Sequence, residues 1–106
     1  MMDLTMLRSA VRAGRFEWRK HALVRLAERN IRQSDILEVL DFGEQIEEYP
    51  DDRPFPGVLL FRVIRGRPLH VVAAYDSEGS WAYVITAYEA SLDEFEADFR
   101  TRRRRP

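Results

Sequence analysis

The sequence predicts an α+β fold, in which N-terminal helices pack on one face of an antiparallel sheet of about four strands. Two observations support this prediction. As far as Gly43, apolar residues recur at three- and four-residue spacing, which is the period of a helix. Beyond Pro56 the apolar period changes to two, and short turns separate runs rich in β-branched residues, which is typical of an antiparallel meander.

Three helices are expected in the first 43 residues. The first covers residues 3–13 and stops at Gly14, and its apolar face is formed by Leu4, Leu7 and Val11. The second runs from Arg19 to Asn30, with an apolar face formed by Ala22, Leu23, Leu26 and Ala27. The third begins at Arg32 or Ser34 and ends at Gly43, with an apolar stripe formed by Ile36, Leu37, Val39 and Leu40.

The strands are expected over residues 45–49, 58–65, 69–75 and 81–88. A loop rich in proline separates the first two strands, and Gly66–Pro68 and Asp76–Gly79 form the later turns. Residues 16–18 form a brief extended segment. The spacing of Leu92, Phe95 and Phe99 predicts a short closing helix.

Size and composition indicate a single globular domain. We expect it to cover residues 1–99 of the 106, followed by a mobile arginine-rich tail over residues 100–106. A hydrophobic content of 45% argues against wholesale disorder, and the absence of cysteine excludes disulfides and thiolate metal sites. No apolar run approaches the length of a membrane span and no signal-peptide pattern is present, so the expected location is cytoplasmic.

The charges are sorted along the chain, although the net charge is only −1. Residues 1–32 carry eight basic and three acidic side chains, whereas residues 33–61 carry one basic and eight acidic side chains. Sixteen of the 17 basic residues are arginine, the residue best suited to bind phosphate. Arginine excess also follows from the base composition of a genome, so it does not by itself identify a nucleic-acid ligand.

The second helix presents a candidate RNA-binding face. At 100° per residue, His21, Arg25 and Arg29 share one side of this helix. Such a face offers phosphate contacts and a group that titrates near neutral pH. The alternative is a solvated flank held by an Arg25–Glu28 pair.

A second candidate group lies in the sheet. His70 interrupts an otherwise apolar strand, and Thr86 and Tyr88 stand beside it if the strands pair in the simplest register. Arg62 and Arg65 add phosphate-binding groups from the preceding hairpin. These residue types suit cleavage of RNA by its own 2′-hydroxyl, for which no metal or cofactor is needed. The alternative is that His70 is a hydrogen-bonded structural residue and Tyr88 packs as an ordinary sheet aromatic.

The acidic residues and glycines identify no further site. Asp51 and Asp52 lie in the proline-rich loop, and Glu47 and Glu48 point to opposite faces if residues 45–49 form a strand. A solvated acidic face is therefore expected in place of a metal site. The five glycines are isolated, so phosphate-loop and dinucleotide signatures are absent.

Between Trp18 and Phe99 the sequence resembles a small bacterial family of unassigned function. The resemblance is carried by KHALVRLAERNI, SDILEVL, GEQIEEYPDDRP, VLLFRVIRGRPLHVV and YVITAYEASLDEFEADF. That family is similar to the RelE, BrnT and MqsR ribonuclease toxins, and its genes often lie beside one for a YgiT-type zinc-finger protein. The resemblance implies a RelE-like fold, RNA as substrate and a zinc-finger antitoxin as partner.

These observations lead to one principal hypothesis and two alternatives. The principal hypothesis is a metal-independent endoribonuclease, an mRNA interferase of a toxin–antitoxin pair. In it His21 and His70 share the roles of general acid and general base. Thr86 and Tyr88 orient the reacting groups or stabilise the anion that forms. The phosphate-binding residues are Arg25, Arg29, Arg62 and Arg65. The alternatives are a non-catalytic protein-interaction module and an RNA-binding domain without cleavage. The RNA sequence preference and the oligomeric state are not determined by the sequence.

Overall fold

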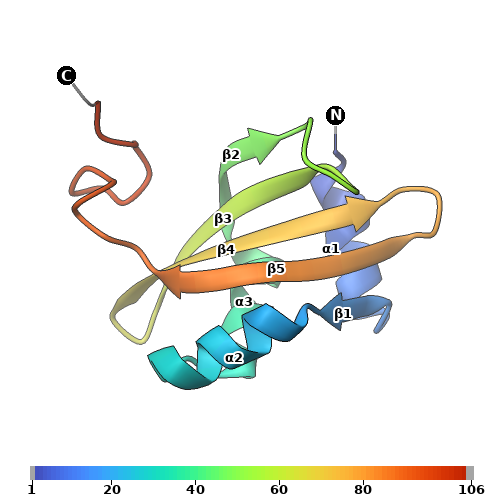
Figure 1. The fold of residues 1–106 in the computed structure, drawn as a ribbon, viewed down its shortest axis with the longest axis horizontal. Helices are drawn as coiled ribbons and strands as arrows, with labels where there is room; N and C mark the ends of the chain where they lie inside the picture. Colours follow the sequence, from blue (N-terminus) through green and yellow to red (C-terminus); the bar gives the residue numbers. More distant parts are fainter. Residues whose placement is uncertain (1, 105–106) are drawn as a thin grey trace.

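The structure is a computed structural model and describes residues 2–104. It has three helices and a five-stranded sheet (Figure 1). In chain order the elements are α1 (Leu4–Arg12), β1 (Phe16–Trp18), α2 (Lys20–Arg29), α3 (Gln33–Phe42), β2 (Glu44–Tyr49), β3 (Gly57–Ile64), β4 (Arg67–Asp76) and β5 (Trp81–Glu89). The expected α+β class is confirmed.

The sheet has one strand more than predicted. Its order is β1-β5-β4-β3-β2, so the four longer strands form the expected antiparallel meander. The extra strand is β1, which pairs parallel to β5 and places Phe16 opposite Ala82 and Trp18 opposite Val84. A three-residue strand carries too little periodicity to be recognised as part of a sheet in the sequence.

Local signals explain how the helices start and stop. The Asp3 side chain accepts hydrogen bonds from the backbone N–H groups of Thr5 and Met6 and so caps α1. Helix α2 ends at Asn30, which adopts the left-handed conformation with φ of 55°. Helix α3 follows Arg32, whose backbone N–H donates to the Asp35 carboxylate.

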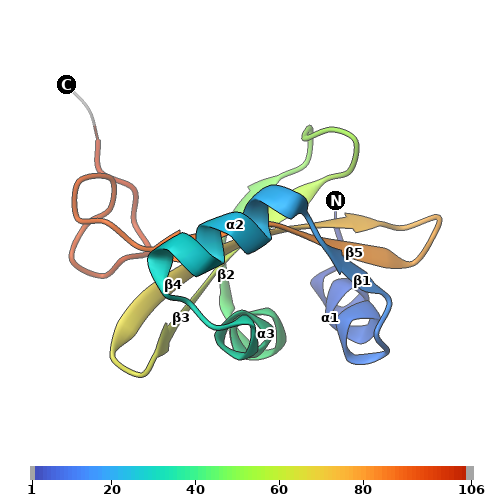
Figure 2. The same cartoon turned by 60° about the horizontal axis from the view of Figure 1, so that its bottom comes forward.

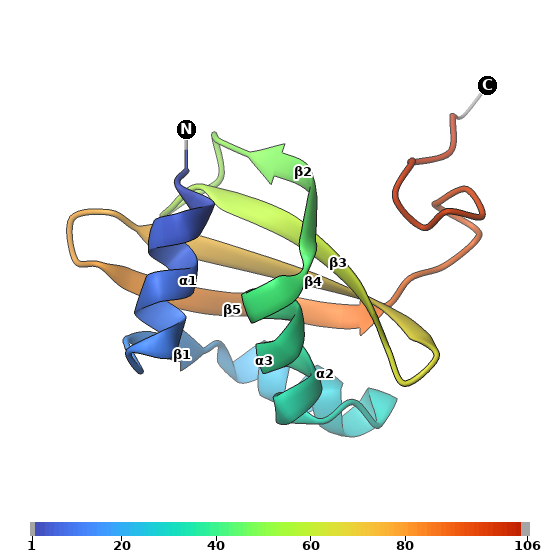
Figure 3. The ribbon, with the colours of Figure 1, turned by 180° about the vertical axis from the view of Figure 1, so that it is seen from behind.

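One hydrophobic core lies between the helices and one face of the sheet, which we call the first face. Helices α1 and α3 lie across this face (Figure 3), and α2 continues from β1 alongside β5 (Figure 2). The helices contribute Leu7, Ala10, Ala22, Leu26, Ile36, Val39 and Leu40 to the core. The sheet contributes Val58, Leu60, Ile64, Leu69, Val71, Ala73, Tyr75, Ala82, Val84 and Ala87.

The opposite, second face of the sheet is also partly covered. The loop between β2 and β3 places Phe55 parallel to Tyr83, with 5.4 Å between the ring centroids. Residues 91–104 curl beyond the end of β5 (Figure 1) and contact the second face through Phe95 on His70 and Arg100 on Phe61. We call residues 91–104 the C-terminal cover. Phe95, 2% exposed, is its buried anchor.

The C-terminal cover is not the helix predicted for residues 92–99. It consists of turns with a single β-bridge between Phe95 and Arg102. Short-range hydrogen bonds compete with a helix here, because the Asp98 carboxylate accepts from the backbone N–H groups of Arg100 and Thr101 and from the Thr101 hydroxyl. These bonds lower the pKa of Asp98 to about 2. Of the apolar residues whose spacing predicted a helix, Phe95 is buried, whereas Leu92 is exposed, so they do not form one helical face.

The predicted mobile tail falls partly on residues 105 and 106, which lie outside the described residues. Within the described part, three of its arginines form ion pairs. Arg100 pairs with Glu44, Arg102 with Glu47 and Glu94, and Arg103 with Glu96. The mobility of this tail stays a prediction.

Candidate functional site

His70 lies on β4 with its side chain on the second face, and it is fully buried. Aromatic rings surround the imidazole edge-on, with centroid distances of 5.7 Å to Phe61, 5.4 Å to Tyr88 and 4.5 Å to Phe95. Strand pairing explains the first two contacts, because Phe61 of β3 and Tyr88 of β5 are the register partners of His70. The third ring comes from the C-terminal cover.

One imidazole nitrogen of His70 is hydrogen bonded and the other is not. Nε2 lies 2.8 Å from the carbonyl oxygen of Phe99, so Nε2 carries the proton and donates it. Nδ1 is buried without a hydrogen-bond partner among residues 2–104. Burial lowers the pKa of His70 below its ordinary value, against the opposing effects of the Phe99 carbonyl and Glu47. His70 is therefore a neutral imidazole with an unused lone pair, which is what a general base needs.

Tyr88 and Thr86 lie on the same face as His70 because β5 contains a bulge. Val72 pairs with Thr86 but Ala73 pairs with Val84, so Ile85 is the extra residue. Without it, Thr86 and Tyr88 would share the core-facing side of Val84. The expected contact of Tyr88 with His70 is therefore present, although strict alternation does not produce it, while Thr86 is the register partner of Val72. Burial raises the pKa of Tyr88, so the phenol keeps the proton that it needs to serve as a hydrogen-bond donor.

Glu47, Tyr49 and Arg102 form a hydrogen-bonded group beside His70. Both carboxylate oxygens of Glu47 accept from Arg102, each at 3.0 Å, and the Tyr49 hydroxyl donates to Glu47 at 2.6 Å. The hydrogen bonds from Arg102 are the main cause of the lowered pKa of Glu47. Burial, followed by the hydrogen bond to Glu47, raises the pKa of Tyr49. This group links β2 to the cover with a fixed bidentate geometry.

Two hollows flank His70, one on the side of each register partner. The first has a volume of about 450 Å³ and is lined by Phe42, Glu44, Phe61, Arg62, Val63 and Arg100. The second has a volume of about 410 Å³ and is lined by Tyr88, Ser91, Asp93, Glu94 and Phe95. The C-terminal cover contributes to both and lies over His70 between them. Moving the cover would therefore expose His70 between two existing depressions.

The comparison with protein families identifies the domain. A family model described as a domain of unknown function, DUF4258, matches residues 18–89. The chain belongs to the DUF4258 family. The match contains His70, Tyr88, Glu47 and Tyr49, whereas α1 and the C-terminal cover lie outside it. No curated protein and no solved structure matches the chain.

Within residues 2–104 of this DUF4258 domain, no hydrogen bond or ring contact joins a helical candidate to His70, although the charge of Arg29 acts on Tyr88. His21 is exposed near the start of α2 and makes no hydrogen bond or ring contact with residues 2–104. Arg25 forms the expected pair with Glu28 on the same exposed flank. Arg29 donates to the carbonyl oxygen of Ala87 at 2.7 Å and so joins the end of α2 to β5. These contacts give Arg25 and Arg29 structural partners.

The hairpin arginines of the DUF4258 domain lie toward α3. Arg62 is 3.4 Å from the Glu38 carboxylate and stacks over the ring of Phe42. Arg65 donates to the buried Asp35 at 2.7 Å. Arg65 therefore neutralises the cap of α3, while Arg62 borders the first hollow.

Several residues of the site are missed by sequence reasoning. Glu47 belongs to an acidic run for which the sequence predicts a solvated face. Arg102 belongs to a tail that the sequence predicts to be mobile. The pairing of Glu47 with Tyr49 carries a weak signal, since residues two apart on a strand share a face. Nothing in the sequence indicates that Phe95 covers His70.

Residues 2–104 contain no cluster of three or more His, Asp or Glu side chains placed to hold a metal ion. None of the helices in this range has the length and apolar content of a membrane span.

Proposed function

We propose that this DUF4258 domain is a metal-independent endoribonuclease of toxin type that cleaves RNA at His70. The observation that carries the proposal is the buried, unpaired Nδ1 of His70 beside the Tyr88 phenol. Native proteins rarely leave a buried polar atom without a partner, and a catalytic role is one of the few explanations for one. The resemblance to the RelE, BrnT and MqsR toxins supports the same reaction, with a zinc-finger antitoxin as the expected partner.

The proposed reaction uses the 2′-hydroxyl of RNA as nucleophile. Nδ1 of His70 takes the 2′-hydroxyl proton, the 2′-oxygen attacks phosphorus, and the bond from phosphorus to the 5′-oxygen breaks. The leaving 5′-oxygen takes a proton from solvent water, and His70 then gives the proton it accepted to the hydroxide that remains. The products are a 2′,3′-cyclic phosphate and a 5′-hydroxyl end, and His70 is neutral again. Tyr88 donates a hydrogen bond to a phosphoryl oxygen, which stabilises the charge that develops there.

The C-terminal cover has to move before RNA reaches His70, because the imidazole is fully buried. The ion pairs that hold the cover to β2 are partly exposed: Arg100 and Glu44 have side-chain exposures of 47% and 53%. Exposed ion pairs of this kind contribute only about 0–1 kcal/mol each. Phe95, the Phe99 carbonyl and the Arg100 guanidinium over the Phe61 ring also attach the cover.

The proposal is tested by mapping 5′ ends of cellular RNA after inducing the wild type, His70→Gln, Tyr88→Phe, His21→Gln and Phe95→Ala, the last of which removes the buried anchor of the cover. We expect new 5′-hydroxyl ends at recurring sequences in the wild type and His21→Gln, none in His70→Gln, and fewer in Tyr88→Phe. Circular dichroism of each purified variant checks its fold, and cleavage by the purified protein in EDTA checks metal independence. New ends that persist in a folded His70→Gln variant, or their absence in the wild type and in Phe95→Ala, would overturn the proposal.

A non-catalytic interaction module is the second candidate. Its supporting observation is the same burial, since three aromatic rings and the Phe99 carbonyl close His70 off from solvent. In this case neither the wild type nor Phe95→Ala produces RNA ends, and a partner protein co-purifies equally with the wild type and His70→Gln.

A further inference from the structure

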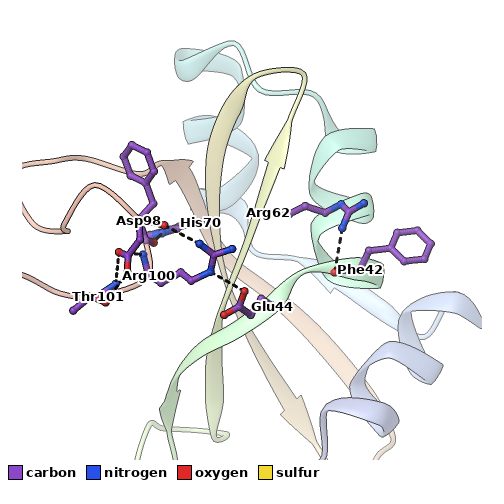
Figure 4. Close-up of polar contacts among 8 residues, drawn as sticks. Phe42, Glu44, Arg62, His70, Asp98, Arg100 and Thr101 are labelled. Atoms are coloured by element: carbon purple, nitrogen blue, oxygen red, sulfur yellow. Dashed lines mark hydrogen bonds and ion pairs between the residues drawn. The ribbon is translucent and has the colours of Figure 1, made fainter.

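The first hollow lies next to His70 on the second face of the sheet. Phe61 connects the two, because its ring contacts the His70 imidazole edge-on and also lines the hollow. Arg100 of the cover lies over the other part of that ring, 4.9 Å from its centroid. Figure 4 shows Arg100 reaching toward Glu44 on one side of this hollow and Arg62 beside Phe42 on the other.

Two apolar side chains of the hollow are exposed. Phe42, the last residue of α3, is 58% exposed, and Val63 of β3 is 54% exposed. Phe42 is not part of the hydrophobic core, and its ring contacts the guanidinium of Arg62 at 5.5 Å. An exposed ring at the rim of a hollow is available for stacking by a flat ligand.

Both arginines of the hollow have unused hydrogen-bond donors. Arg62 makes only two long contacts, from Nε to Glu38 at 3.4 Å and from Nη1 to the carbonyl oxygen of Phe42 at 3.5 Å. Arg100 donates from Nε to Glu44 and from Nη1 to the Asp98 carbonyl. Within residues 2–104, Nη2 of neither arginine makes a hydrogen bond. Planar guanidinium groups with free nitrogens bind phosphate oxygens readily.

We propose that this hollow binds one unpaired RNA nucleotide adjacent to the bond cleaved at His70. The base stacks on Phe42, and the phosphate binds Arg62 and, while the cover is docked, also Arg100. When the cover moves to expose His70, Arg100 leaves with it and Arg62 keeps the phosphate. This inference rests on the proposed function and adds a substrate-binding site to it. Glu38 and Glu44 neutralise the two arginines in the free protein, so the phosphate replaces partly exposed carboxylates and binding falls as salt rises.

The lining of the hollow favours a nucleotide over a protein side chain. An aromatic ring and two guanidinium groups border one depression of about 450 Å³. A base can therefore stack on the ring while its phosphate binds the guanidinium groups. An apolar side chain of a partner protein would use Phe42 and Val63 but leave the free Nη2 groups without acceptors. A base held in a duplex has no free face to offer Phe42, so a single strand is required.

The test is fluorescence anisotropy with a labelled, single-stranded 2′-O-methyl oligoribonucleotide, which cannot be cleaved by its 2′-oxygen. It uses the full chain, Phe42→Ala and Arg62→Gln, with Arg12→Gln and Leu92→Ala as controls for an exposed arginine and an exposed apolar residue. Loss of one stacked base should weaken binding by about 5- to 150-fold in Phe42→Ala. Arg62→Gln should lower the slope of log K against log salt by about one, and the controls should bind as the wild type does.

The outcomes separate this site from the proposed function. RNA ends that depend on His70, together with equal binding by Phe42→Ala and the wild type, would overturn the nucleotide site and leave the ribonuclease. Binding that depends on Phe42 without any cleavage would keep the nucleotide site and overturn the ribonuclease. No binding by the wild type at low salt, or loss of a co-purifying protein as the only effect of Phe42→Ala, would overturn the nucleotide site.

Discussion

The imidazole of His70 lies edge-on against the ring of Phe95, with 4.5 Å between their centroids and 80° between their planes. These residues come from different layers: His70 belongs to the sheet, and Phe95 to a segment without regular secondary structure. The contact therefore joins a fully buried candidate residue to the C-terminal cover, which contains no helix or strand. The accessibility of His70 depends on how firmly Phe95 is held.

We expect Phe95→Ala to release the C-terminal cover without unfolding the sheet. Truncation of a core phenylalanine costs about 3–5 kcal/mol, but here the loss is limited to the free energy that docks the cover. The free energy of unfolding measured in urea should therefore fall by less than this range. Trypsin should cut faster after the arginines at positions 100, 102 and 103. If the free energy of unfolding falls by the full amount expected for a core phenylalanine and trypsin cleavage is unchanged, the cover is an integral part of the fold.

The stability of the protein should fall as the pH decreases through the ordinary range of histidine. Burial lowers the pKa of His70 in the folded state, so below the unfolded-state pKa of about 6.5 the unfolded chain binds a proton that the folded chain does not. The contribution from neutral His70 is fully present above that pKa and is lost at up to about 1.4 kcal/mol per pH unit below it. Urea unfolding between pH 7.5 and 5 measures this slope.

The matched comparison uses the two histidines. His70→Gln should flatten the pH dependence, whereas exposed His21→Gln should leave it unchanged. An equal slope in the wild type and His70→Gln would assign the proton uptake to another group.

The Glu47–Arg102 pair should contribute modestly to the attachment of the cover. Side-chain exposures of 23% and 46% allow solvent screening, so a double-mutant cycle with Glu47→Gln and Arg102→Gln should give a coupling of about 0.5–1 kcal/mol. In Arg102→Gln alone, the pKa of Glu47 should rise toward its ordinary value, because the Arg102 hydrogen bonds are the main cause of its lowering. Carboxyl NMR titration measures this shift. Arg103→Gln is the control, since Arg103 pairs with Glu96 inside the cover, and a comparable rise there would contradict the assignment.

Asp35 should be more important to stability than its partner Arg65. Its side chain is 4% exposed and accepts from both the Arg32 backbone N–H and the Arg65 guanidinium. Asp35→Ala removes the cap of α3 and should cost about 1–2 kcal/mol in thermal or urea unfolding. Arg65→Ala leaves the cap bond intact and should leave RNA cleavage unchanged, because Arg65 lies with α3 and not at His70. A selective loss of cleavage in a stable Arg65→Ala variant would return Arg65 to the site.

Much of the fold follows from local signals in the sequence. The stripes that end at Gly14, Asn30 and Gly43 predict all three helices to within a few residues, because each ends at a residue that suits a helix stop. The change of period after Pro56 predicts the meander. Phe16–Trp18 is too short to show a period, and its pairing with β5 depends on contacts 66 residues along the chain.

The candidate site was predictable only where it depends on strand register. His70 and Tyr88 are cross-strand partners, and the turn at Asp76–Gly79 predicts that their strands pair. The turn alone would place Ala87 opposite His70, and the extra residue Ile85 moves Tyr88 into that position. The separation of His21 from His70 depends on which face α2 packs against, and α2 packs its Ala22 and Leu26 into the first-face core. Helical periodicity identifies a buried side but not the face of the sheet that receives it.

The pairing of β1 with β5 also constrains when the protein can fold during synthesis. A chain emerging from the ribosome exposes β1 and the apolar side of α2 long before residues 81–89 exist to receive them. Such high contact order slows folding and leaves the early segments without their native partners. Newly made chains therefore remain incompletely folded, and exposed to chaperones and proteases, until β5 has been translated and inserted between β1 and β4.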